Sequence, residues 1–296
     1  MFFMMGSMED MMMGGIKENQ NWDVMTYVYP GGEDAVIEWA DNHSLEYETM
    51  LTFPIGLQND TREFTGYGLD KISTVDDGEA MMVIELKEGT LPQNGTTPPQ
   101  VLIDEGTSVF LEWNVGEKRI VMVGANPVEV EITGVTKGEI ARTIYFHRSD
   151  LSEMVGIEAT TVLLQLPEDG DTEGLAEVSV GLVIKKDLIQ SFETLLEQQQ
   201  SMYIAIEGLG IIIAVAVLFN TLLMNLSERD TELATLRVLG APMNKLGTMM
   251  FWEHLAIGIV GGILGAIFAF FGTVAMINSF VQWAFYMTVE PQILPI

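Results

Sequence analysis

The stretch Gly208–Ser227, GLGIIIAVAVLFNTLLMNLS, decides the fold class of this chain. It contains 20 residues and none of them is Asp, Glu, Lys or Arg. At about 1.5 Å of rise per residue, a helix of this length spans about 30 Å, which is the thickness of the hydrocarbon core of a bilayer. We therefore predict a membrane-spanning helix at residues 208–227.

A second uncharged run extends from Leu255 to Val289 and is longer than one span needs. Towards its end lie three aromatic residues of types that are enriched at membrane interfaces, Trp283, Phe285 and Tyr286. We predict a second spanning helix at residues 255–278, followed by an extracytoplasmic interfacial segment at residues 279–296.

Charge gives the orientation of the two predicted spans. The connector at residues 228–254 carries Arg229, Arg237 and Lys245, and short basic connectors lie on the cytoplasmic side of a membrane. Residues 1–207 are then extracytoplasmic, and they hold 11 Lys and Arg against 37 Asp and Glu, a net charge of −26. The chain is predicted to be a multi-pass protein of the cytoplasmic membrane.

Composition excludes several classes of function. A strongly acidic surface repels phosphate backbones, so nucleic acid is not an expected partner. The chain has no cysteine and its three histidines, His43, His147 and His254, are far apart, so neither a metal site nor another cofactor is expected. It also lacks a readable catalytic set and a phosphate-binding loop of the Walker type, so this chain itself is not expected to hydrolyse ATP.

The extracytoplasmic domain, at residues 21–186, is predicted to be an α+β domain. Two strand-helix-strand patterns stand at its ends, and two split units of this kind are typical of a ferredoxin-like subdomain. The first pattern comprises Trp22–Tyr29, Glu33–His43 and Leu45–Ile55, and the second comprises Thr160–Leu166, Thr172–Val178 and Gly181–Ile184.

A small β-rich insertion is predicted between the two patterns, at about residues 95–150. It contains four short runs that have strand character and are separated by Gly, Asn and Pro: Val101–Ile103, Arg119–Val123, Val128–Val135 and Thr143–Phe146. A stalk helix at residues 187–207 is expected to continue into the first span. Met4, Met5, Met8, Met11 and Met12 recur at helical spacing, so residues 1–20 are interpreted as the stub of a preceding spanning helix or as a flexible Met-rich segment.

The connector contains a helix with clear boundary signals. Ser227 is a candidate N-cap, acidic residues follow in the first turn, and Gly240 with Pro242 is a stop signal. Leu233, Leu236 and Leu239 form an apolar stripe along this helix. The stripe either packs against neighbouring helices of the chain or contacts a cytoplasmic partner.

The connector also carries a family resemblance. Its sequence at residues 228–241, ERDTELATLRVLGA, resembles the signature of FtsX-like ABC transporter permeases, the MacB and LolC/LolE group. The resemblance continues through Glu253 and the Gly-rich run GIVGGILG at residues 258–265. Upstream, it is weaker and includes VLIDE at 101–105, VGE at 115–117 and ITGV at 132–135.

The resemblance implies an ABC transporter permease, with an α-helical membrane domain of at least two spanning helices and a MacB-like extracytoplasmic α+β domain. The partners it implies are an ABC ATPase subunit, a second permease copy or a sister permease, and an extracytoplasmic protein. The residues expected to couple the chain to the ATPase are Glu228, Arg229, Glu232, Leu233, Leu236, Arg237 and Gly240. Because the family has four spanning helices per unit, the chain is expected to be a fragment that lacks the first and the last.

Four glycines of the second span form a candidate surface for helix packing. Gly258 and Gly262, like Gly261 and Gly265, are four residues apart, and small residues at this spacing let two helices approach closely.

Three functions remain open at this point. The chain is a permease that couples ATP hydrolysis to export or mechanotransmission, a non-transporting activator of an extracytoplasmic enzyme such as a cell-wall hydrolase, or a membrane-anchored binding protein. A neighbouring gene for an ATP-binding cassette would favour the first two, and one for a cell-wall hydrolase the second alone.

Overall fold

The computed structural model describes residues 16, 20–58, 60–75, 77–137, 142–167, 170, 172–240 and 242–280. These residues form two compact units, one made of Leu195–Asn278 and the other of the described residues before Leu195. Apart from residues 16, 20, 279 and 280, the predicted stub at 1–20 and the predicted interfacial segment at 279–296 lie outside the described residues.

The unit before Leu195 contains the predicted ferredoxin-like arrangement. Its sheet begins with strands in the order β12-β1-β11-β2, and each neighbouring pair is antiparallel. The elements are β1 (Val24–Tyr27), α3 (Glu33–Asn42), β2 (Glu46–Leu57), β11 (Thr161–Gln165), α6 (Leu175–Val178) and β12 (Gly181–Ile184). Each strand-helix-strand unit thus has a strand of the other unit between its own two strands, which confirms the predicted ferredoxin-like subdomain.

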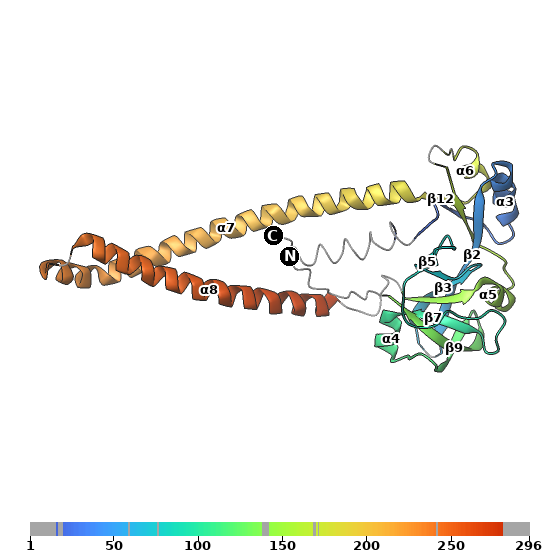
Figure 1. Cartoon of the computed structure of the whole chain (residues 1–296), viewed down its shortest axis with the longest axis horizontal. Coiled ribbons are helices and arrows are strands. Elements are labelled where there is room, and N and C mark those ends of the chain that lie inside the picture. The colour runs from blue at the N-terminus through green and yellow to red at the C-terminus, as the bar shows by residue number, and fades with distance from the viewer. Residues whose placement is uncertain are drawn as a thin grey trace. The chain divides into compact units, whose positions relative to one another are not determined.

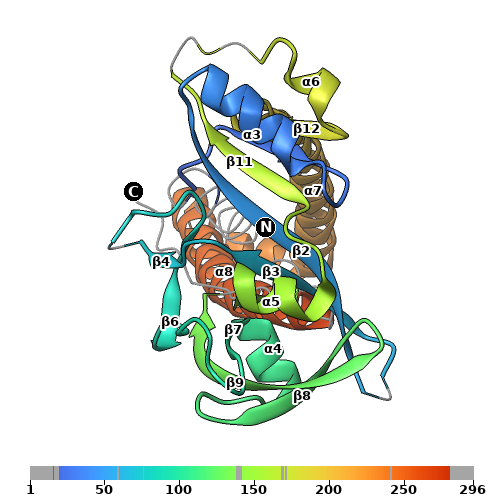
Figure 2. The same cartoon turned by 90° about the vertical axis from the view of Figure 1, so that its right-hand side faces the viewer.

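Helices α3 and α6 cover one face of this four-stranded part (Figure 2). Val36 and Ala40 of α3 are fully buried, and they belong to one apolar cluster with Leu175 of α6 and with Val162 and Leu164 of β11. Alternating strand residues face this cluster, which is why the period-two pattern of the sequence predicted these strands.

The sheet continues beyond β2 through strands that the chain inserts between β2 and β11. Its further order is β3-β10-β7-β9-β6, and β8 pairs with both β2 and β9. These strands are β3 (Glu63–Leu69), β6 (Leu86–Gly89), β7 (Gln100–Asp104), β8 (Lys118–Val123), β9 (Asn126–Thr136) and β10 (Thr143–His147). The inserted part therefore begins before residue 95, because β3 and β6 already belong to it.

Two short helices of the inserted part, α4 (Glu105–Leu111) and α5 (Arg148–Val155), contribute to the largest apolar cluster (Figure 1). That cluster includes the fully buried Leu51, Ile55, Ile103 and Phe146. A separate two-stranded parallel sheet, β4 (Ser73–Thr74) with β5 (Val83–Ile84), lies between β3 and β6 in the sequence.

Two long helices follow β12 in the described part of the chain. Helix α7 runs from Lys185 to Val238, and α8 runs from Met243 to Phe280 (Figure 1). The segments Lys185–Arg229 and Gly247–Gly272 each contain a run that is long and apolar enough to cross a membrane. Large apolar side chains such as Ile212 and Phe268 are exposed along them, at 66% and 73%. Such surfaces are suited to lipid or to other spanning helices rather than to water.

Candidate functional site

The predicted coupling residues lie at the end of α7 and in the turn that follows it. The sequence predicted a separate helix with Ser227 as its N-cap, and this prediction is wrong, because α7 continues through Ser227 without interruption. The physical reason is the absence of a helix breaker: residues 211–239 contain neither Gly nor Pro. A serine caps a helix only where the preceding backbone is not already helical.

The end of α7 follows the predicted stop signal. Gly240 has φ of +87°, the left-handed conformation that glycine adopts readily after the last turn of a helix. The N–H of Leu239 still donates to the carbonyl oxygen of Thr235 at 3.1 Å, and α8 begins at Met243, directly after Pro242. Gly240 therefore provides the sharp reversal between the two long helices.

A salt bridge joins the two helices close to this turn. Nη1 of Arg229, on α7, lies 2.8 Å from Oε2 of Glu253, on α8. The side chains are 49% and 35% exposed, so in water such a pair would contribute at most about 1 kcal/mol. Its geometric effect is to link the last turns of α7 with the start of α8.

The apolar stripe is exposed where its side chains are described. Leu236 is 40% exposed, and Leu239 and its neighbour Val238 are 79% and 88% exposed. Glu228 is exposed as well. The remaining predicted residues, Glu232, Leu233 and Arg237, are part of the helical backbone of α7, and their side chains lie outside the described residues.

The four glycines of α8 do not contact another helix within the described part of the chain. A Cβ atom built on Gly258, Gly261, Gly262 or Gly265 would meet nothing within 4 Å. One of these positions, Gly261, lines a shallow apolar groove of about 460 Å³ together with Ala256, Ile257, Val260 and Leu264. The predicted packing role therefore concerns helices other than those described, and it stays a prediction.

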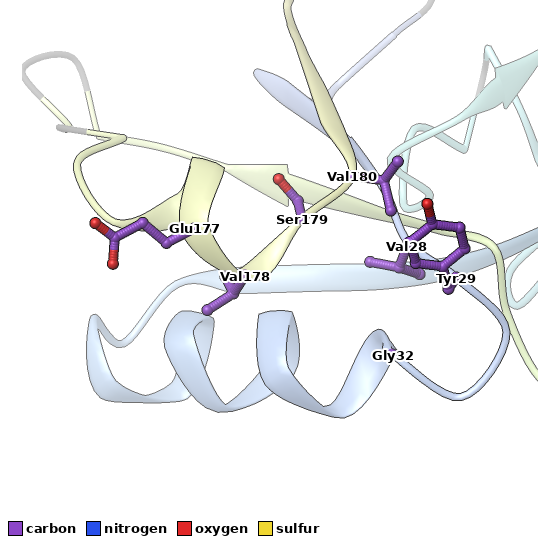
Figure 3. Close-up of a pocket in the computed structure, with 7 residues that line it drawn as sticks. All are labelled: Val28, Tyr29, Gly32, Glu177, Val178, Ser179 and Val180. Carbon is purple, nitrogen blue, oxygen red and sulfur yellow. The ribbon is translucent and has the colours of Figure 1, made fainter.

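A second concave surface lies on the ferredoxin-like subdomain. Val28 and Tyr29 at the end of β1, Gly32 before α3, and residues 177–180 line a pocket of about 420 Å³ (Figure 3). Its one charged lining residue is Glu177, whose carboxylate points away from the end of the pocket at Tyr29 (Figure 3). None of the predicted site residues lines this pocket, and a single carboxylate does not define a catalytic site.

Among the described residues, no group of three His, Cys, Asp or Glu side chains is arranged to hold a metal ion. The candidate functional site is therefore the turn between α7 and α8, with its exposed leucines and the Arg229–Glu253 pair. This arrangement presents exposed apolar side chains beside an ion pair that joins the two helices.

Comparison with known proteins gave two kinds of match. Two solved structures are similar to part of this chain. The extracellular domain of the noncanonical ABC-type transporter YknZ from Gram-positive bacteria is 13% identical, covers 53% of this chain and 88% of its own, and has a TM-score of 0.36. The periplasmic region of MacB from Actinobacillus actinomycetemcomitans is 17% identical, covers 60% of this chain and 97% of its own, and has a TM-score of 0.34.

A search among curated proteins found no match. The family model for the FtsX-like permease C-terminal domain matches residues 204–296, the part that holds the end of α7, the turn and α8. The members of this family are membrane-embedded permeases, in agreement with the two apolar helices described above. Residues 204–296 of this chain are therefore similar to the C-terminal domain of FtsX-like permeases.

Proposed function

We propose that this chain is the permease subunit of an ABC transporter and that it couples ATP hydrolysis by a separate ATPase subunit to motion of its extracytoplasmic unit. The observation that carries the proposal is the continuity of α7 from Lys185, directly after β12, to Val238. An uninterrupted helix shifts or rotates as one element, so displacement at its cytoplasmic end reaches the sheet. The chain itself has no enzymatic role in this proposal.

The proposed topology follows the charge distribution. Residues 1–207 are extracytoplasmic, the spans lie within α7 and α8, and residues 228–254 face the cytoplasm. The sharp reversal at Gly240 supports this topology, because it returns the chain towards the membrane immediately after α7 ends. In the proposed assembly, a second permease copy or a sister permease supplies further spanning helices.

The exposed leucines support an ATPase contact at the end of α7. If the apolar stripe packed against the chain's own helices, Leu236 and Leu239 would be buried, yet they are 40% and 79% exposed. An apolar anchor surrounded by charged residues is typical of a protein-protein contact. Arg229, which binds Glu253, is better suited to fixing the angle between α7 and α8 than to contacting the partner.

Substitution of Leu236 by Asp tests this contact. At a partner interface, the charge should reduce co-purification of the ATPase by at least about tenfold, corresponding to about 1.4 kcal/mol. The stability of the permease alone should stay within about 0.5 kcal/mol of the wild type, because the side chain is already exposed. Affinity purification of the tagged chain and its thermal unfolding in detergent measure the two quantities.

Leu195→Asp is the matched control, because Leu195 is an exposed leucine of α7 outside the predicted span. This variant should retain the ATPase. Internal packing of Leu236 predicts the opposite pattern, a loss of stability of about 2–4 kcal/mol with the ATPase still bound. A destabilised Leu236→Asp permease that still binds its ATPase would refute the proposed coupling contact.

A further inference from the structure

The first turn of α7, Lys185–Leu188, is attached to the segment that leads into β1. The backbone N–H of Lys185 donates to the carbonyl oxygen of Asp23 at 2.8 Å, and its Nζ donates to the carbonyl oxygen of Gln20 at 2.5 Å. Leu188 packs against the apolar cluster that contains the buried residues Trp22, Met81 and Leu163. The position of this first turn therefore depends on the position of residues 20–23.

Residues 20–23 are in turn held by residues 78–82, which we call the clasp. The side-chain amide of Asn21 donates to the carbonyl oxygens of Gly78 and Ala80 at 3.1 and 2.9 Å. The backbone N–H of Asn21 donates to the carbonyl oxygen of Met81 at 2.8 Å, and a β-bridge joins Gln20 to Met82. The clasp thus connects the inserted part of the domain to the first turn of α7.

A buried carboxylate, that of Glu48, is hydrogen-bonded to the clasp. Glu48 of β2 is 8% exposed, and its Oε2 accepts a hydrogen bond from the backbone N–H of Met81 at 3.1 Å. Its Oε1 lies 3.5 Å from Nζ of Lys71, whose side chain is 65% exposed. The other charged group that acts on it is Asp70, which itself pairs with Arg148.

Burial raises the pKa of Glu48 above its ordinary value of 4.5, because the ionised form loses its water. The hydrogen bond from Met81 and the positive charge of Lys71 act in the opposite direction, and Asp70 adds to the rise. When the clasp opens, water reaches Glu48 and its pKa returns towards the ordinary value. Closing of the clasp is therefore coupled to uptake of a proton.

We propose that Glu48 makes the clasp responsive to acid, so that the first turn of α7 is held most tightly when Glu48 is protonated. The added stability of the closed clasp is fully present below the ordinary pKa of the open state. It is lost as the pH rises through the raised pKa of the closed state. This inference concerns residues 20–188 and does not rest on the coupling to an ATPase proposed above.

Hydrogen exchange of the full chain in detergent, without an ATPase, tests the proposal. Exchange of peptides containing residues 20–23 and 78–82 is measured from about pH 7.5 to about pH 4.5 and corrected for the intrinsic dependence of exchange on pH. In the wild type, corrected exchange of both peptides should slow by at least about twofold on acidification. In Glu48→Gln, exchange should be slow at every pH, because the neutral amide resembles the protonated carboxyl.

Glu85→Gln is the control for other carboxylates, because Glu85 also pairs with a lysine, Lys137 at 3.0 Å, but is 45% exposed. It should keep the wild-type response to pH. Lys71→Met tests the same carboxyl without altering it. Loss of the Lys71 cation should move the change in exchange rate to higher pH, and the exposed position should tolerate the substitution. Wild-type exchange that is constant or faster in acid, or a response to pH that persists in Glu48→Gln, would overturn the proposal.

Discussion

At the scale of single residues, the carboxylate of Asp104 joins three elements of the inserted part. Asp104 ends β7, is fully buried, and caps α4 by accepting from the N–H of Thr107 at 3.1 Å. It also accepts from Nη1 of Arg142 at 2.5 Å and from the N–H of Thr143, the first residue of β10, at 3.0 Å. The side chain of Arg142 is only 2% exposed, so both charges of this pair depend on each other.

Asp104→Ala should therefore lower the stability of the chain by about 3–5 kcal/mol, because it removes a fully buried carboxylate that pairs with the buried guanidinium of Arg142 and accepts from the N–H groups of Thr107 and Thr143. Chemical unfolding monitored by tryptophan fluorescence measures the change. Asp60→Ala removes the carboxylate of a partly exposed pair with Arg62 and should cost at most about 1 kcal/mol. Equal losses of stability in the two variants would show that burial does not determine how much the Asp104–Arg142 pair contributes to stability.

Some of these residue roles were readable from the sequence and others were not. The stop signal at Gly240 was readable because a left-handed residue after a helix is usually glycine, and Gly240 has φ of +87°. The need for glycine at position 106 was not readable, because the side chain that requires it is distant in sequence. A Cβ on Gly106 would lie 1.2 Å from Nη1 of Arg142. The Arg229–Glu253 pair was missed for a related reason, because 24 residues and a turn separate its members.

At the scale of elements, the sequence pattern did not predict strand β3, which contains two glycines. Strand β3, EFTGYGL, looks like a turn-rich segment because of Gly66 and Gly68. In the structure these glycines allow close packing: a Cβ on Gly66 would lie 2.6 Å from Cγ1 of Ile55, and one on Gly68 would lie 3.1 Å from Cα of Arg148. Glycine marked close approach of neighbouring elements here rather than the end of a strand.

The glycines of α8 lead to a prediction about assembly. Gly262→Leu should not disturb the chain itself, because a Cβ at this position meets nothing within 4 Å. If a helix of a second permease chain packs there, the larger side chain should weaken association by about tenfold, or about 1.4 kcal/mol. Crosslinking or analytical ultracentrifugation in detergent measures association, and membrane extraction confirms insertion.

Gly272→Leu provides a matched control on the same helix. Position 272 is equally open but does not belong to either glycine pair, Gly258 with Gly262 or Gly261 with Gly265. It should assemble as the wild type does. If Gly262→Leu also assembles normally, the glycine face of α8 contacts lipid rather than another helix.

At the scale of the whole molecule, composition along the chain predicted which part is an α+β domain and which part forms apolar helices. An acidic, mixed α+β part precedes two apolar helices, because charge and hydrophobicity are segregated between residues 1–207 and the remainder. Composition did not predict the extent of the inserted part, since β3 to β6 are short or contain glycine, and β3 and β6 each pair with a strand that comes much later in the chain, β10 and β9. Long-range pairing of this kind leaves little local signal.

The orientation of the chain in the membrane is the prediction on which the transporter proposal depends most directly. The chain has no cysteine, so single cysteines can be introduced without a background signal. Val109 of α4 is 54% exposed and reports on the extracytoplasmic unit better than its fully buried neighbour Thr107. Lys245, near the start of α8, is exposed and reports on the connector.

In intact cells, a membrane-impermeant maleimide should label Val109→Cys and leave Lys245→Cys unlabelled, because the basic connector is predicted to remain in the cytoplasm. After permeabilisation both variants should react, which shows that each thiol is accessible in the folded chain. Labelling of both in intact cells would place the connector outside and remove the surface at which a cytoplasmic ATPase could act. Labelling of position 245 alone would invert the topology, and then α7 could not transmit motion from the cytoplasm to the sheet.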